Sequence, residues 1–259
     1  MTKKVFAVAL FSLLLWTPNV YGIEYNLADL IDNNKQVTVG DKIFYGFFFS
    51  VTPPADCTAD NSCSWSSGAG GITVEPMYWG SYPSGSPSSG DPLIPTIRFG
   101  GTIGYLALDS KSSLPAVAAD VRLGYYVKTA NGLRLIKDIH QSFNATIVGY
   151  RSNVTVKEQV YTASGTQPIG HSTLVAGASD FVDPPGEVTQ NDILDLTNAP
   201  YSQVYVEKDI QLYAVNGGLA AISIEDQGIS ELPEPGFYGA LALGLSGLVL
   251  AFRRRSAAK

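Results

Sequence analysis

Hydrophobic and polar residues alternate in several short segments in the middle of this chain. In residues 120–129, Val121, Leu123 and Val127 fall on one side of an extended backbone, whereas Arg122 falls on the other. A period of two is typical of a strand that buries one face. The same pattern predicts strands at residues 36–39, 42–51, 133–137, 143–147, 154–160, 204–215 and 219–224.

Turn residues connect several of these segments. Gly40-Asp41, Asn131-Gly132 and Asn216-Gly217-Gly218 each lie between two strand segments, as in β-hairpins. Many antiparallel strands without an intervening helical pattern predict an all-β fold, and we expect an antiparallel β-sandwich or jelly-roll-like domain.

Few segments depart from this pattern. Helices are expected only at Leu27–Asp32 and as one turn at Asn191–Leu196. Ser81–Pro92 is rich in Ser, Gly and Pro and is expected to form a long loop.

The N-terminus has the layout of a secretory signal peptide. Lys3 and Lys4 precede the apolar run Val5–Trp16, and Pro18 follows it. The run has 12 residues, too few for a spanning helix, which needs about 20. We therefore expect residues 1–22 to direct export through the Sec machinery and to be removed.

The C-terminus carries a second apolar segment. Pro233-Glu234-Pro235 is followed by the uncharged residues 236–252 and by Arg253, Arg254 and Arg255. At about 1.5 Å per residue the segment reaches about 25 Å, the lower limit for a transmembrane helix. Arginines beside such a helix stay on the cytoplasmic side, so the exported body stays outside. The expected division is a signal peptide at 1–22, an exported domain at 23–232 and an anchoring segment at 233–259.

This C-terminal arrangement resembles the PEP-CTERM sorting signal of Gram-negative bacteria. The resemblance implies an exosortase as partner, with Pro233, Glu234 and Pro235 as recognition residues and Arg253–Arg255 as the stop. It also implies that residues 236–252 anchor the protein temporarily in the inner membrane. Processing would then deliver it to the cell surface or to the exopolysaccharide matrix.

Charge and composition narrow the functional classes. Of all residues 45% are hydrophobic and 15% are charged, which argues against disorder. Residues 23–232 hold 11 basic and 22 acidic side chains, a net charge of −11. An acidic surface repels phosphate, so no nucleic-acid partner is expected.

Cys57 and Cys63 are the two cysteines of the chain. In an oxidising compartment a pair this close in sequence is expected to form a local disulfide. They lack the CxxC spacing and the neighbouring histidine of a redox or zinc site, so neither a metal nor a cofactor is expected.

The sequence holds no G-x-S-x-G nucleophile elbow, no H-E-x-x-H zinc motif and no Walker A loop, and no catalytic residue is assigned. His140 and His171 are the two histidines, and the sequence places no nucleophile and acid beside either. Acid pairs such as Asp180/Asp183 and Asp192/Asp195 leave a glycoside hydrolase open as a less favoured alternative, because two carboxylates suffice for that reaction.

Aromatic residues near the Gly/Ser/Pro-rich loops suggest another function. Trp65, Tyr78, Trp79 and Tyr82 are candidates for stacking on sugar rings, although Tyr78 and Trp79 fit equally well as a cap on the core. Our first hypothesis is a non-enzymatic, exported protein of the cell surface or extracellular matrix. The alternative is a carbohydrate-binding module for exopolysaccharide that uses these aromatics.

Overall fold

The structure is a computed structural model that describes most of residues 23–232. The described residues are 23–52, 63–66, 68–79, 94–101, 104–108, 117–130, 134–149, 152–177, 186–196, 201–214, 218–232 and 246. The signal peptide, the sorting motif Pro233–Pro235, the arginine cluster, and residues 236–252 apart from Ser246 lie outside them and stay predictions, as does the loop at Ser81–Pro92. Within these ranges no helix has the length and apolar character to cross a membrane.

Strands dominate the described part of the chain, and two short helices interrupt them. The strands are β1 (Tyr25–Asn26), β2 (Val37–Val39), β3 (Lys42–Thr52), β4 (Cys63–Ser66), β5 (Thr73–Trp79), β6 (Ile94–Gly100), β7 (Gly104–Leu108), β8 (Val117–Thr129), β9 (Leu135–Val148), β10 (Asn153–Thr162), β11 (Pro168–Gly177), β12 (Gly186–Asp195), β13 (Gln203–Ala214) and β14 (Leu219–Leu232). The helices are α1 (Leu27–Asp32) and the 3₁₀ turn η1 (Ala69–Gly71).

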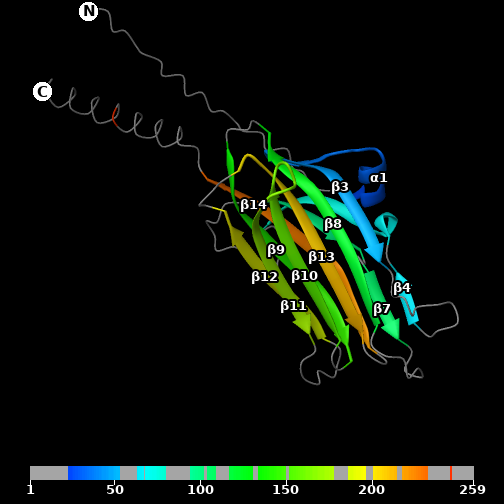
Figure 1. The fold of residues 1–259 in the computed structure, drawn as a ribbon. Coiled ribbons are helices and arrows are strands. Elements are labelled where there is room, and N and C mark those ends of the chain that lie inside the picture. Colours follow the sequence, from blue (N-terminus) through cyan, green and yellow to red (C-terminus); the bar gives the residue numbers. More distant parts are fainter. Residues whose placement is uncertain are drawn as a thin grey trace, which may run out of the picture.

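The strands form two antiparallel sheets that face each other (Figure 1). We call the sheet β1-β5-β6-β14-β7-β4, with β9 and β12 beyond β14, sheet A. Sheet B has the order β11-β10-β13-β8-β3-β2. The predicted all-β antiparallel sandwich is therefore confirmed.

Strand β14 runs through the interior of sheet A and pairs on both sides. β14 pairs with β9 along its whole length, and on its other side it pairs first with β7 and further on with β6. β6 and β7 therefore lie end to end, and so do their outer neighbours β5 and β4. This arrangement places β4 and β5 at opposite ends of the sheet.

Local sequence explains helix α1. The Asn26 side chain accepts hydrogen bonds from the backbone nitrogens of Ala28 at 2.9 Å and Asp29 at 3.4 Å, which caps the helix start. Leu27 and Leu30 are spaced to lie on one face, and both are fully buried. The helix predicted at Leu27–Asp32 is confirmed.

The helical turn predicted at Asn191–Leu196 is wrong. These residues belong largely to β12, which pairs with β9 from Gly186↔Ile147 to Asp195↔Asp138. Ile193 and Leu196 have helical spacing, but a strand beside β9 hydrogen-bonds the backbone of the whole segment. Tertiary pairing overrides so short a local pattern.

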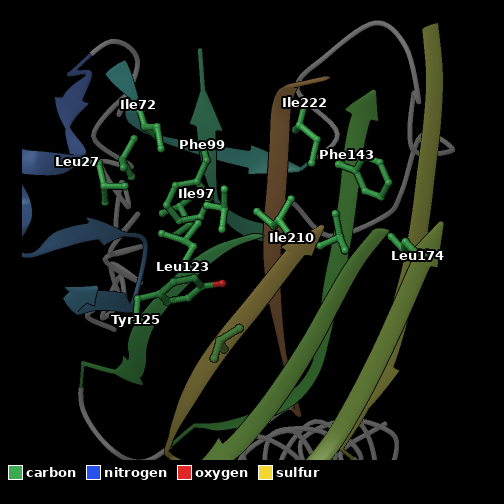
Figure 2. Packing of buried hydrophobic residues seen from close by; sticks show 14 of the residues in the cluster. Leu27, Ile72, Ile97, Phe99, Leu123, Tyr125, Phe143, Leu174, Ile210 and Ile222 are labelled. Atoms are coloured by element: carbon green, nitrogen blue, oxygen red, sulfur yellow. The ribbon is translucent and has the colours of Figure 1, made fainter. Parts of the chain in front are cut away.

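The hydrophobic core lies between the two sheets. Figure 2 shows Leu123 and Tyr125 of sheet B pointing toward Ile97 and Phe99 of sheet A. The Tyr125 ring centroid lies 5.8–6.0 Å from those of three phenylalanines, Phe44, Phe47 and Phe99. Aromatic contacts at this range join the sheets at the end of the sandwich near α1.

A charged cluster occupies the middle of this core. Lys208 of β13, Glu158 of β10 and Glu225 of β14 all have fully buried side chains. The Lys208 Nζ lies 2.9 Å from Glu158 Oε2 within sheet B and 2.6 Å from Glu225 Oε1 across in sheet A. The cluster therefore links the two sheets by charge as well as by packing.

Two carboxylates share this one ammonium group. Burial raises the pKa of Glu225, and the Lys208 charge offsets this only in part. Burial lowers the pKa of Lys208, but Glu158 and Glu225 outweigh that effect and hold it above its ordinary value. Lys208 therefore stays charged in the core, whereas Glu225 ionises less readily than an ordinary glutamate.

We expect Lys208→Met to lower the free energy of unfolding by about 3–5 kcal/mol, because it leaves buried carboxylates without a counter-charge. Urea unfolding followed by circular dichroism measures the change. The matched control is Lys157→Met, an exposed lysine of β10, which should shift stability by no more than about 0.5 kcal/mol. Equal effects of both variants would contradict this role of Lys208.

Candidate functional site

The structure separates the loop aromatics that the sequence singled out. Trp65 lies in β4, whereas Tyr78 and Trp79 lie in β5. Following the register through β7 and β6 to β14, Trp65 is level with Ala220 and Tyr78 with residue 229, about 30 Å apart along the strand. These residues do not share one patch.

Tyr78 is the member of this group whose side chain is described. It packs against the core, and its hydroxyl approaches Gly40 in the β2–β3 turn. Its place fits the core-capping alternative. Tyr82 and the side chains of Trp65 and Trp79 lie outside the described residues, so sugar binding there stays a prediction.

The predicted disulfide also stays a prediction. Cys63 begins β4, but its side chain and the whole of Cys57 lie outside the described residues.

A different set of aromatics forms a row on the outer face of sheet B. The register pairs Tyr45 of β3 with Tyr126 of β8, Tyr126 with Tyr205 of β13, and Tyr205 with Tyr161 of β10. Successive ring centroids are 5.5, 4.8 and 5.9 Å apart. We call these four side chains the tyrosine row.

Strand alternation turns the tyrosine row outward. The sequence neighbours Phe44, Tyr125, Val160 and Val204 are fully buried in the core, so the tyrosines beside them point away from it. Each of the four tyrosines is partly exposed. Four strands about 4.8 Å apart give the row a length of about 15 Å.

Two glycines make room for the rings. The Tyr205 ring lies over Gly124 of β8, where a Cβ would overlap its hydroxyl. A Cβ on Gly46 would lie 3.0 Å from the Tyr126 ring. Gly46 has a φ of 62° in a bulge of β3, a conformation that glycine adopts readily. Both rings thus lean over glycine backbone toward the neighbouring strand.

The phenols of Tyr45, Tyr161 and Tyr205 stay neutral at physiological pH, because their pKa values lie above the ordinary value. Burial, followed by the charge of Glu207 and the neighbouring phenols, raises the pKa of Tyr205 to about 12. Burial also raises the pKa of Tyr45 and of Tyr161. The Lys128 ammonium lies 4.9 Å from the Tyr45 ring centroid, within cation–π range. The row therefore offers aromatic surface beside one cation.

The sequence carried a signal for this row, namely tyrosine at polar-face positions of alternating strands. Tyr126 follows the buried Tyr125, and Tyr205 lies between the buried Val204 and Val206. What joins the row is the pairing of strands far apart in sequence, which a single sequence does not show.

His140 belongs to a hydrogen-bonded cluster on the outer face of sheet A. Its Nε2 lies 2.7 Å from Asp138 Oδ1, and the Ser230 hydroxyl donates to the same oxygen. Burial opposes ionisation of Asp138, but these hydrogen bonds outweigh it and hold its pKa below the ordinary value. A serine nucleophile needs the imidazole between serine and acid. Here the acid lies between them, so the cluster is not arranged as a catalytic triad.

The acid pair Asp192/Asp195 does not converge on a cleft. Both residues lie in β12 three positions apart, so they point to opposite faces of the strand. Asp192 Oδ2 accepts a hydrogen bond from Ser172 at 2.5 Å. Asp180 and Asp183 lie outside the described residues. Within the described part of the chain, no cluster of three or more His, Cys, Asp or Glu side chains is placed to hold a metal.

No family model and no curated protein matches this sequence. Among solved structures it is similar to a carbohydrate-binding module of the β-sandwich superfamily, with 11% identity and a TM-score of 0.30. That match covers 73% of this chain but 57% of the other, so the chain spans little more than half its length.

Two further structures are about equally similar. The module TmCBM61, solved with β-1,4-galactotriose, has 10% identity and a TM-score of 0.29 over 66% of this chain and 88% of its own. A Stig cyclase from Fischerella has 8% identity and a TM-score of 0.28 over 70% and 84%. At these values the likenesses carry no function over to this chain.

We expect Tyr205 to ionise near pH 12 rather than at the ordinary 10.0. The raised pKa belongs to the folded state, so with rising pH the unfolded chain loses the Tyr205 proton first, near pH 10. The contribution of the protonated phenol to the free energy of unfolding is therefore complete below pH 10 and is lost as pH rises toward 12. Tyr205→Phe should therefore lose less stability over this interval than the parent protein. Phenolate absorbance and urea unfolding measure both effects, and identical titration curves for the two proteins would contradict the assignment.

Proposed function

We propose that this protein is an exported, non-enzymatic module of the cell surface or extracellular matrix that binds polysaccharide through the tyrosine row. The observation that carries the proposal is the continuous line of four outward-facing tyrosines across four paired strands. Single exposed aromatics are common on protein surfaces, whereas a contiguous exposed aromatic surface is typical of an interaction site.

The chemistry of the row suits sugar rings. A tyrosine combines an apolar ring with a polar hydroxyl, and a sugar likewise has apolar C–H faces and polar edges. The raised pKa values of Tyr45, Tyr161 and Tyr205 keep these phenols protonated, so they can donate and accept hydrogen bonds. Because the rings stand on paired strands, little side-chain or backbone entropy is lost on binding.

Export supplies the setting for this activity. The predicted signal peptide and the resemblance of residues 233–255 to a PEP-CTERM signal both send residues 23–232 out of the cytoplasm. Handling by an exosortase would place the tyrosine row beside exopolysaccharide.

A hydrolytic function has less support than binding. The carboxyls of Asp120 and Asp209 share a hydrogen bond, whereas glycosidases hold their two carboxyl groups about 5–9.5 Å apart. This pair is thus too close for either the retaining or the inverting mechanism of glycoside hydrolysis.

The test is affinity electrophoresis of the full chain in mild detergent, through gels that contain glucan, xylan, mannan or galactan. The parent protein should be retarded by at least one of these polysaccharides. The double variant Tyr126→Ala/Tyr205→Ala should bind about tenfold or more weakly, because each ring contributes about 0.5–1.5 kcal/mol beyond the area it buries.

Two controls accompany this test. Tyr126→Phe/Tyr205→Phe keeps the rings and should retain most of the retardation. Ile193→Ala removes an apolar side chain that is 58% exposed on β12 and should change nothing. Unaltered binding by the double alanine variant, or no binding to any of the polysaccharides, would overturn the proposal.

A further inference from the structure

A pocket opens on the outer face of sheet B, at the opposite end from the tyrosine row. Its volume is about 390 Å³. Its described lining residues are Thr52, Ala118, Ala119, Asp120, Asn153, Gln211, Leu212 and Tyr213. They come from the end of β3, the start of β8, the start of β10 and the end of β13, so four paired strands frame it.

The pocket lies on the same sheet face as the tyrosine row. Asp120 and Tyr126 are six residues apart in β8, an even number, so both side chains point outward. In β13, Gln211 and Tyr205 have the same relation. The distance along either strand is about 20 Å. Arg122, Asp209 and Lys157 point outward between the two sites, so the surface that joins them is polar.

Polar side chains offer hydrogen-bond donors and acceptors at the pocket. Asp120, Asn153 and Gln211 belong to its lining. The Asp120 carboxyl shares a hydrogen bond with Asp209, and Gln211 Nε2 lies 3.5 Å from Asp209 Oδ2, at the limit for a hydrogen bond. Carboxyl and amide groups of this kind can pair with the hydroxyl groups of a ligand.

The charges around the pocket select among ligands. Burial, and then the hydrogen bond and charge of Asp209, raise the pKa of Asp120, and the charges of Arg122 and Lys157 partly offset this. The two acids disfavour a carboxylated or sulfated ligand. The two nearby cations in turn disfavour a metal ion. A neutral ligand rich in hydroxyl donors is repelled neither by the acids nor by the cations.

We propose that this pocket is a second subsite of the same glycan-binding face and that it holds one sugar unit of a neutral polysaccharide whose chain also crosses the tyrosine row. Hydroxyl groups of the sugar donate to Asp120, while the amides of Gln211 and Asn153 donate and accept. Tyr213 supplies an aromatic wall. This inference rests on the proposed function, because the tyrosine row provides the first point of attachment.

The two subsites predict a dependence on ligand length. Oligosaccharides too short to bridge about 20 Å contact the tyrosine row alone, whereas longer ones gain the pocket as well. Affinity should therefore rise with length until the oligomer spans both subsites and then level off. Neutral oligomers should bind more tightly than polygalacturonate oligomers of equal length.

Isothermal titration calorimetry of the full chain in mild detergent tests this, with oligomers of glucan, xylan, mannan and galactan of increasing length. Gln211→Ala and Asp120→Asn should weaken binding of the long oligomers about tenfold, as expected for losing a hydrogen bond of about 1.4 kcal/mol to the ligand. Both variants should bind the short oligomers with the same affinity as the parent protein. Asn191→Ala, an exposed amide of β12 in sheet A, is the matched control and should change neither.

The outcomes separate the two proposals. If Tyr126→Ala/Tyr205→Ala weakens all lengths but Gln211→Ala weakens none, the pocket is not a subsite and the tyrosine row stands alone. If the double alanine variant binds like the parent, or no oligomer binds, the proposed function fails and the pocket inference fails with it. Equal affinity for neutral and polygalacturonate oligomers would overturn the selectivity. Circular dichroism confirms that each variant is folded.

Discussion

The buried pairing of Lys208 with Glu158 and Glu225 constrains the rest of the structure, because it fixes the register of the strands that bear it. Side chains in a strand alternate between faces, so moving β13 by one residue would expose Lys208 and bury Tyr205. Such a shift would leave Glu158 and Glu225 in the core without their counter-charge, which is strongly unfavourable. The charge that holds the sheets together thereby also orients the tyrosines outward.

Small residues then determine whether the outward tyrosines form a continuous surface. Tyr205 lies over Gly124, and the Tyr126 ring lies against Gly46. A side chain at either glycine would push the ring above it away from the sheet. Gly46 has a further constraint, since its positive φ forms the bulge that turns Phe47 into the core after Tyr45 has pointed outward. The row thus depends on backbone features as much as on the tyrosines.

Much of the sandwich was predictable from local pattern, whereas the site was not. The alternation of Val121, Leu123 and Val127 predicted the buried face of β8, and the hairpin at Gly40-Asp41 joins β2 to β3 as expected. These features depend on neighbours in sequence.

The features that the sequence did not predict depend on pairing between distant strands. Tyr45 and Tyr205 meet through Tyr126, although they are far apart along the chain. In the sequence Lys208 looks like an ordinary charged residue of a strand with one polar face. Its burial is explained by Glu158 of β10 and Glu225 of β14, which supply its counter-charges. The prediction of a helical turn at Asn191–Leu196 was wrong for the same reason, because the local sequence does not show the pairing of this segment with β9.

Buried ion pairs also hold the end of β14. Lys42 is fully buried and forms ion pairs with Glu231 and, at 2.8 Å, with Asp41, while Arg134 Nη1 lies 3.2 Å from Glu231 Oε2. Burial and the hydrogen bond with Asp41 raise the pKa of Glu231. Burial opposes ionisation of Asp41, but its hydrogen bonds with Glu231 and Lys42 outweigh this and lower its pKa. Any proton they share therefore resides on Glu231.

A chain held through residues 233–255, as the PEP-CTERM resemblance implies, would be pulled at Leu232. Glu231 is the residue before it, and Lys42 ties that residue to the β2–β3 hairpin of sheet B. A pull at Leu232 is therefore shared between the β9–β14 ladder of sheet A and a buried ion pair to sheet B. Because both must break before β14 frays, such an attachment would be fixed to the two sheets that frame the core, one of which carries the tyrosine row.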